Sequence, residues 1–398
     1  MNTKKIISCV VAPLVITGLL VYSVNEYCVR KTEEWYPTSG VWRLYNNDVK
    51  DKGIALLNLS VKNGHMMMFG TSELNNSPDI KVTTVPTSFY PNQYLNREVD
   101  IVGYAGADTL INAIRLGSIT NLGNVPSVYI SSFTWFIDKE YYKEGIQKNF
   151  SELQYYKFMN NPRVSGETKK EISRAVVYVL DNKKMFNESI LYAKLYSDNT
   201  FLKQLARVML KPFYEARYAY LNFRDNIRAY KLVKKYQNKY RYQEKNIKWQ
   251  EDRDIVAKQS RALCTTTPSE MFAYKKWYNW HKNNDIDEHK DKFIKSTVGD
   301  SKEYDYHELL LKVVSEEKIK PLVILTSANG YYWDFAGLAK SERIKYFDKC
   351  ILLQEKYDIP YLNLAYMSYI PYTFRDQAHY TSQGWFEVNE KITKHFTK

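Results

Sequence analysis

The sequence predicts an α/β domain with a central parallel sheet and a helical insertion, preceded by one N-terminal transmembrane helix. Three observations predict it: short apolar runs that alternate with amphipathic stretches, a long glycine-poor region in mid-chain, and one uncharged N-terminal run. The chain has 398 residues, of which 44% are hydrophobic and 15% aromatic, so it can bury a sizeable core and is not disordered.

The N-terminal run covers residues 6–24, which carry no charge and are long enough to cross a hydrocarbon core of about 30 Å. Two lysines precede it, so the positive-inside rule places residues 1–5 in the cytoplasm and residues 25–398 outside the cell. A cleaved signal peptide is disfavoured because no A-x-A-like site follows, and a lipoprotein signal at Cys9 because the apolar run continues beyond it. We therefore expect an uncleaved anchor in the cell membrane.

Five short apolar segments bounded by turn residues are typical of buried strands. They lie at residues 65–69, 99–104, 127–133, 322–326 and 361–365. Helix-like stretches such as 108–116 and 341–357 separate them, and the apolar residues of the second stretch fall on one face. Strands that alternate with helices predict a parallel sheet covered by helices on both faces.

The region at about 139–249 is predicted to be the helical insertion, because it lacks strand-like segments and contains few glycines. Its second half is basic: from 207 to 248, twelve Lys and Arg residues stand against three acidic ones, in a chain of net charge +13. Five of the basic residues recur near one helix face: Arg217, Arg224, Arg228, Lys231 and Lys235. This face is a predicted surface for an anionic polymer or anionic lipid, with an ordinary solvated helix face as the alternative. The extracellular placement argues against nucleic acid.

The first candidate for chemistry is Ser72, which follows an apolar strand ending at Gly70. Open parallel sheets place their active groups outside the carboxyl ends of the strands. A serine at such a turn exposes its hydroxyl, and its own backbone N–H can help to hold an oxyanion. Taken alone, Ser72 can equally be a helix cap.

The second candidate is the D-x-x-H pattern of Asp376 and His379 near the C-terminus. A serine nucleophile needs a base within hydrogen-bonding reach, and histidine, with an ordinary pKa of about 6.5, is the usual one. A carboxylate three residues earlier can orient the imidazole and stabilise its charged form. Taken alone, the pattern also fits a surface turn with an incidental ion pair.

A third candidate is the glycine pair Gly103 and Gly106, at the point where the second predicted strand leads into a helix. A glycine there lets a backbone N–H approach a substrate oxygen closely, as an oxyanion hole requires. The alternative is a tight strand-to-helix turn with no role in binding.

The order of these segments along the chain resembles that of the SGNH hydrolase superfamily: a serine after the first strand, glycines after the second, and D-x-x-H near the end. Within that superfamily the chain is similar to the DltD family, extracellular proteins of teichoic acid D-alanylation. The matching segments include F-G-T-S-E-L around Ser72, Trp135-Phe136, Ala328-Asn329-Gly330 with Trp333, and Gly384-Trp385. The resemblance spans nearly the whole chain and implies an SGNH-hydrolase-like three-layer domain.

The resemblance implies a role for each matching residue: Ser72 as nucleophile, His379 as base, Asp376 as its orienting acid, and Gly103 or Gly106 as a backbone oxyanion donor. The chain departs from the pattern at Thr71, where a smaller serine is usual, and after the third strand, where the usual asparagine is missing. Thr134 or the Ser72 amide is the expected second donor.

The implied activity is that of a membrane-anchored serine acyltransferase or esterase in D-alanylation of (lipo)teichoic acid. It would form a D-alanyl ester at Ser72, pass it to a polymer hydroxyl and need no cofactor. The implied partners are the polyanionic polymer, the membrane and other membrane proteins of the pathway. Two alternatives stay open: an SGNH esterase or thioesterase acting on another cell-wall or carrier ester, and a non-catalytic anchored scaffold.

Two other groups of residues contain side chains that can form sites. His281, Asp285 and His289 fit neither the H-E-x-x-H nor the calcium-loop spacing, so a charged loop is expected there and no metal site. Cys264 and Cys350 can form a disulfide outside the cell, although their spacing does not require one.

Overall fold

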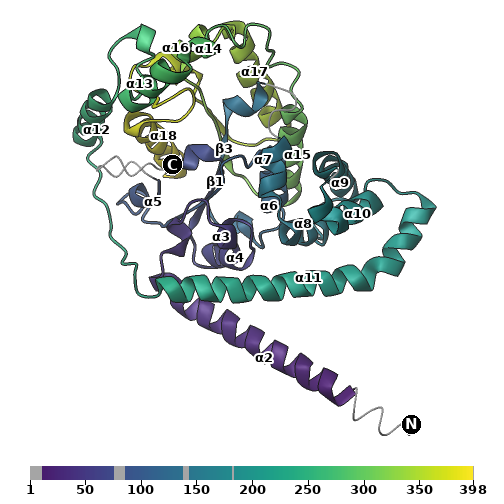
Figure 1. The fold of residues 1–398 in the computed structure, drawn as a ribbon. Coiled ribbons are helices and arrows are strands. Elements are labelled where there is room, and N and C mark those ends of the chain that lie inside the picture. The colour runs from purple at the N-terminus through teal and green to yellow at the C-terminus, as the bar shows by residue number, and fades with distance from the viewer. Residues whose placement is uncertain (1–10, 76–85, 138–142, 182, 398) are drawn as a thin grey trace, which may run out of the picture.

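The computed structural model describes residues 11–75, 86–137, 143–181 and 183–397. Its five strands form one parallel sheet in the order β2-β1-β3-β4-β5 (Figure 1). The strands are β1 (Met66–Gly70), β2 (Val99–Gly103), β3 (Ser127–Ser131), β4 (Leu322–Leu325) and β5 (Tyr361–Asn363). All five predicted strands are confirmed, with bounds that differ by one or two residues. The last is shorter because the Asn363 side chain accepts the Ala365 amide and turns the chain.

Helices cover both faces of the sheet, because the strands are apolar on both sides. Met67 and Phe69 of β1 face a large core formed with α6 (Thr109–Leu116), α15 (Glu303–Glu316) and α17 (Lys340–Lys356). Met66 and Met68 point the other way, into a second core with α18 (Ser382–Phe396). These three layers confirm the predicted fold class.

The chain between β3 and β4 is helical. Its helices are α7 (Lys143–Asn149), α8 (Glu152–Met159), α9 (Gly166–Leu180), α10 (Asn187–Tyr196), α11 (Phe201–Tyr236), α12 (Trp249–Leu263), α13 (Lys275–Asn284), α14 (Ile286–His289) and α15. Serine side chains cap two of them, Ser151 on α8 and Ser165 on α9. The predicted insertion at 139–249 therefore spans α7 to α11 and the first residue of α12, and residues 138–142 lie outside the described part.

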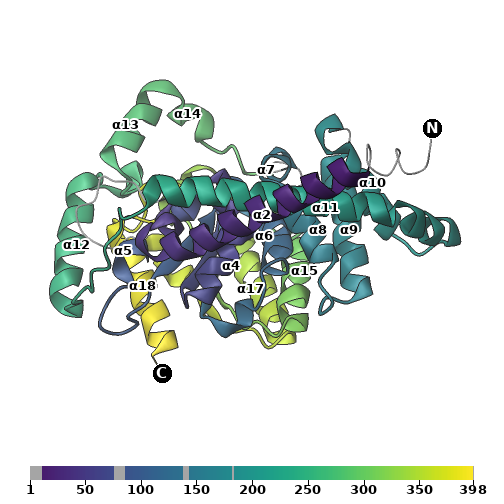
Figure 2. The same cartoon turned by 90° about the horizontal axis from the view of Figure 1, so that it is seen from below.

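The N-terminal helix α2 (Ala12–Trp35) projects from the domain and crosses α11 near the C-terminal end of that helix (Figures 1 and 2). At the crossing, Asn226 donates to Asn25 over 2.9 Å, and the Tyr230 ring packs on Tyr27 and Trp35. The apolar side chains before the crossing are exposed. Among the described residues, one helical segment is long and apolar enough to span a membrane, Ala12–Thr38. Residues 6–10 of the predicted span are outside the described part.

Cys264 and Cys350 are not bonded to each other. Cys264 and Cys350 are both buried free thiols, so the disulfide considered from the sequence is not formed in this structure. Burial raises the pKa of the Cys264 thiol to about 12, which keeps it protonated and unreactive at neutral pH.

Candidate active site

Ser72 lies at the carboxyl end of β1, beside the point where the strand order reverses between β1 and β3. Gly70 and Gly103 are opposite each other in the β1–β2 register. A Cβ on Gly103 would stand 2.9 Å from Leu74 Cδ1 and 3.0 Å from the Gly70 carbonyl oxygen. The two glycines thus make room for Leu74 to fold back, and the short helix η4 (Ser72–Leu74) begins at the serine. This turn presents Ser72 at the position where open parallel sheets bind ligands.

A turn near the C-terminus brings His379 to Ser72. The Asp376 carboxylate accepts the backbone N–H of Ala378 (2.9 Å) and of His379 (2.8 Å), which closes the turn around the acid. Its second oxygen lies 2.8 Å from His379 Nδ1. His379 Nε2 lies 2.9 Å from Ser72 Oγ, across a sequence separation of 307 residues. The structure therefore brings together the three residues that the sequence singled out separately.

The ionisation of the pair suits a serine and its base. Burial would raise the pKa of Asp376, but the charge of His379, its ring N–H and the two turn amides bring that pKa down to about 2. Burial would lower the pKa of His379, but the Asp376 carboxylate, its hydrogen bond and the charge of Glu73 raise it above the usual 6.5. The aspartate is thus ionised at neutral pH, and the histidine is a stronger base than a free imidazole.

The structure adds Glu73, which sequence reasoning treated only as part of a matching segment. Its carboxyl group is buried, which raises its pKa, while His379 and a hydrogen bond from Ser132 act in the opposite direction. The Ser132 hydroxyl lies 3.0 Å from the Thr134 hydroxyl. The sequence signal for Glu73 is its position directly after the candidate nucleophile Ser72. Burying an acid there costs free energy unless its charge is compensated.

The predicted oxyanion donors differ in how they are placed in the structure. The Gly106 N–H donates to Thr71 Oγ1 over 3.2 Å, and that hydroxyl donates to the Tyr104 carbonyl over 3.1 Å. The Gly106 N–H is therefore already engaged in a hydrogen bond within the protein. Its φ of +86° lies in the left-handed region, which explains why a glycine stands at this position. Gly103 is explained by the close approach to Gly70. Thr134 lies beside Ser132 and stays a predicted donor, as does the Ser72 amide.

A short helix after β4 holds the catalytic turn from outside. Asn329 caps α16 (Gly330–Phe335), and its side-chain N–H₂ donates to the Asp376 carbonyl over 3.3 Å. The Asn329 backbone N–H and Trp333 Nε1 both donate to the Gln377 carbonyl, each over 3.1 Å. These bonds explain why the Asn329 and Trp333 positions belong to the matching pattern although neither touches Ser72.

The predicted basic face divides in the structure. Arg217 is half-buried and paired with Glu152 (2.9 Å) and Glu188 (3.6 Å), so its charge is already matched and it is removed from the predicted surface. The other four residues are exposed on α11: Arg224, Arg228, Lys231 and Lys235.

The fold and this geometry define an SGNH-hydrolase-like α/β protein with a Ser-His-Asp arrangement at the carboxyl edge of its sheet. The chain belongs to the DltD family, because the family profile described as "DltD protein" matches residues 43–397. It is similar to Protein DltD of Bacillus subtilis (strain 168), with 22% identity over 343 residues that cover 83% of this chain and 82% of the relative.

Proposed function

We propose that this protein is a membrane-anchored serine acyltransferase that acts in D-alanylation of (lipo)teichoic acid through a D-alanyl ester on Ser72. The observation that carries the proposal is the hydrogen-bonded line from Ser72 Oγ through His379 to Asp376, with distances of 2.9 and 2.8 Å. Family membership supports the substrate, because the DltD resemblance implies teichoic acid D-alanylation.

The proposed reaction has two steps. In the first, Ser72 Oγ attacks the carbonyl carbon of an activated D-alanyl ester or thioester, and its proton passes to His379 Nε2. The imidazolium, stabilised by Asp376, then protonates the leaving group as the old acyl bond breaks. In the second, a polymer hydroxyl gives its proton to His379 and attacks the carbonyl carbon of the Ser72 ester. The bond from the acyl carbon to Ser72 Oγ then breaks, and the imidazolium protonates Oγ, which restores the free serine and the neutral histidine. Water in place of the hydroxyl gives hydrolysis.

Replacing Ser72 tests the proposal. Full-length wild-type protein in detergent, incubated with a D-alanyl thioester, should gain the mass of one D-alanyl group, located on the peptide that contains Ser72. Ser72→Ala should gain nothing, and cells that carry it should lose D-alanyl esters from their surface polymer. The expected fall in turnover is about 10⁶-fold, because the nucleophile is removed.

Ser269→Ala is a matched control, because Ser269 is exposed and outside the site. It should leave both measurements unchanged. A folded Ser72→Ala protein that sustains normal polymer D-alanylation would exclude the acyl-enzyme and favour an anchored scaffold. Acylation of Ser72 without transfer to polymer would point instead to an esterase or thioesterase on another ester.

We also propose that α2 anchors the domain in the cell membrane with the domain outside. The exposed apolar run of α2 supports the anchor, and α11 extends it: its N-terminal part exposes Phe201, Leu202, Leu205, Val208, Met209 and Phe213. On a helix of 3.6 residues per turn, these residues lie on one broad side of this part of α11. Such a surface, with basic residues nearby, suits a lipid interface.

Labelling in intact cells tests this topology. A cysteine introduced at the exposed position Ser269 should react with a membrane-impermeant maleimide before lysis, whereas Cys264 and Cys350 are buried and serve as an internal background. Reaction only after lysis would reverse the proposed orientation.

A further inference from the structure

A second cluster of chemistry-bearing residues lies outside the candidate active site, where helices α13 and α14 meet. His281 is on α13, His289 ends α14, and Asp285 stands between the two helices. The sequence predicted a charged loop here, but the two helices bring one ligand atom of each residue to within 4.8 Å of the others. All three side chains are partly buried.

The geometry places one carboxylate between two imidazoles. Asp285 Oδ1 lies 2.5 Å from His281 Nδ1, and Asp285 Oδ2 lies 3.8 Å from His289 Nε2. Tyr332 of α16 approaches the opposite side of the His289 ring, with its hydroxyl 3.3 Å from Nδ1. If Nδ1 carries the ring proton and donates it to Tyr332, the lone pair of Nε2 faces the carboxylate. In that tautomer, a cation bound between the nitrogen and the carboxylate would contact two electron-rich atoms.

We propose that His281, Asp285 and His289 form a binding site for a divalent transition-metal cation of the zinc class. Two imidazole nitrogens and one carboxylate oxygen are a donor set that Zn²⁺ accepts, with water as the fourth ligand. Bonds of about 2.0–2.2 Å in a tetrahedron separate ligand atoms by about 3.4 Å. The separations of 2.5 and 3.8 Å run to different oxygens of Asp285, so side-chain rotation has to bring one of these oxygens to that distance from both imidazole nitrogens.

The surroundings complete the site. Ring centroids of Trp277 and Trp280 lie 4.5 and 4.7 Å from that of His281, which shields one side of the cluster. The Tyr332 hydroxyl occupies the position of the outer hydrogen-bond partner that metal-bound histidines usually have. This partner comes from a different element, so the cluster is built from more than one helix.

The consequence for the fold is a clamp. The chain after α14 already hydrogen-bonds to the end of α16, from Asp291 N to the Phe335 carbonyl (3.1 Å) and from Phe293 N to the Ala336 carbonyl (2.8 Å). In Figure 1, α13, α14 and α16 lie together at one end of the domain. An ion held by α13 and α14, with Tyr332 as its outer partner, would fasten this arm to the helix whose other end supports the catalytic turn. The site is independent of the proposed reaction at Ser72.

Metal titration tests the site. Full-length protein with a histidine-free affinity tag, stripped with a chelator in detergent, is titrated with Zn²⁺ against a chromophoric chelator, and separately with Co²⁺ while its visible spectrum is recorded. We expect one tight equivalent and the absorption bands of a four-coordinate Co²⁺ ion. Asp285→Asn and His289→Gln should each weaken Zn²⁺ binding at least a hundredfold, and Tyr332→Phe about tenfold through loss of the outer partner.

Glu288→Gln and His395→Gln are matched controls, because they remove an acid beside the cluster and a histidine in the distant helix α18. Both should keep the wild-type affinity. The proposal is overturned if the wild-type protein takes up no stoichiometric metal, or if the combined Asp285→Asn, His289→Gln protein binds Zn²⁺ as tightly as the wild type. Circular dichroism of each variant establishes that lost binding does not reflect lost folding.

Discussion

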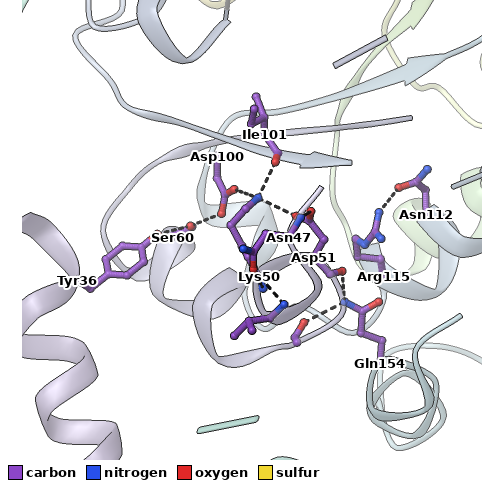
Figure 3. A network of polar contacts seen from close by, with 12 residues as sticks. Tyr36, Asn47, Lys50, Asp51, Ser60, Asp100, Ile101, Asn112, Arg115 and Gln154 are labelled. Atoms are coloured by element: carbon purple, nitrogen blue, oxygen red, sulfur yellow. Dashed lines mark hydrogen bonds and ion pairs between the residues drawn. The ribbon is translucent and has the colours of Figure 1, made fainter. Parts of the chain in front are cut away.

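Two polar clusters of this protein contain similar charged groups, but we expect one to stabilise the fold and the other to take part in a reaction. In the buried charge network of Lys50, Asp51, Asp100 and Arg115, the Lys50 ammonium contacts Asp100 (2.8 Å), Asp51 (2.8 Å) and the Ile101 carbonyl (2.6 Å) (Figure 3). In the candidate active site, Asp376 contacts His379 (2.8 Å) and, more loosely, Arg375 (3.8 Å), and His379 faces a hydroxyl from a distant segment.

The clusters differ in exposure and in how their charges are balanced. The side chains of Lys50, Asp51 and Asp100 are 0% exposed, whereas those of His379 and Asp376 are 21% and 14% exposed. Burial would lower the pKa of Lys50, but the two aspartates raise it above its usual value, so the network holds its charges internally. Asp100 also accepts a hydrogen bond from the Ser60 hydroxyl, which in turn contacts the hydroxyl of Tyr36, the residue directly after α2.

The comparison teaches that a charge cluster alone does not indicate a reaction. The network is fully buried, so no substrate can reach it. The Asp376–His379 pair is partly exposed and contacts the Ser72 hydroxyl. The network is therefore expected to matter for stability and the Ser72 group for turnover, and substitutions can separate the two.

After the loss expected for Ser72→Ala, the largest effect is expected for Asp376→Asn. The asparagine can still accept the turn amides, but its N–H₂ cannot accept the His379 ring proton, so the imidazole loses its orientation and its charge partner. Transfer or hydrolysis of a D-alanyl thioester should fall about 10⁴-fold, as for the equivalent change in the chymotrypsin triad. The folded protein should keep most of its stability.

The same variant has a signature in the pH profile. The base must be neutral, so wild-type activity should rise with pH through the raised pKa of His379, above 6.5. In Asp376→Asn, burial is no longer offset by the carboxylate, so the acid limb should move to lower pH. The measurement is kcat/KM against pH for both proteins. An acid limb that stays in place would mean that Asp376 does not set the ionisation of His379.

Lys50→Met should have the opposite pattern. It preserves the length of the side chain but leaves Asp51 and Asp100 buried without their shared cation, which should lower the free energy of unfolding by about 3–5 kcal/mol. Activity per folded molecule should change little. Urea unfolding of full-length protein in detergent measures the first effect, and active-site acylation measures the second.

Lys62→Met is the matched control, because Lys62 is exposed and its 3.0 Å pair with Glu33 is at the surface. Its effect should stay below about 1 kcal/mol. Equal destabilisation by both substitutions would show that the buried pairs contribute no more than a surface one.

The two clusters were not equally visible in the sequence. Ser72 and the Asp376–His379 pair were predictable because strand ends, a D-x-x-H turn and their order along the chain are local features. The Lys50–Asp100 pair was not, because 50 residues separate its members and neither stands in a recognisable pattern. The Thr71–Gly106 bond was missed for the same reason, since it joins two turns that only the sheet register brings together.

The basic face illustrates the limit of periodicity. Helical spacing placed five basic residues together, and the structure exposes four of them. Arg217 differs because α8 and α10 pack against α11 there and supply Glu152 and Glu188. The acids that neighbouring helices bring to α11 depend on tertiary packing. The spacing of residues within α11 therefore does not predict them.

The smallest expected effect concerns two further buried acids, Asp108, which caps α6, and Glu303, the first residue of α15. Asp108 accepts the Ile111 amide over 3.1 Å, and Glu303 accepts the Thr109 amide over 3.0 Å. Burial raises the pKa of Asp108 to about 7, and burial together with the Asp108 charge raises that of Glu303 well above its usual range. A carboxyl whose pKa is higher in the folded state binds its proton more tightly there. Stability should therefore fall as pH rises from about 4 towards 7.

Asp108→Asn should remove part of that dependence. Asparagine is as good a helix cap as aspartate and carries no charge, so the α6 cap is kept while the repulsion with Glu303 disappears. The variant should be more stable than wild type by about 1–2 kcal/mol at pH 7.5, with a flatter slope between pH 4 and 7. Asp358→Asn, at an exposed acid, should leave that slope unchanged, and urea unfolding across the pH range measures both. A less stable Asp108→Asn protein at pH 7.5 would mean that this carboxylate, like that of Asp376, is needed in its charged form.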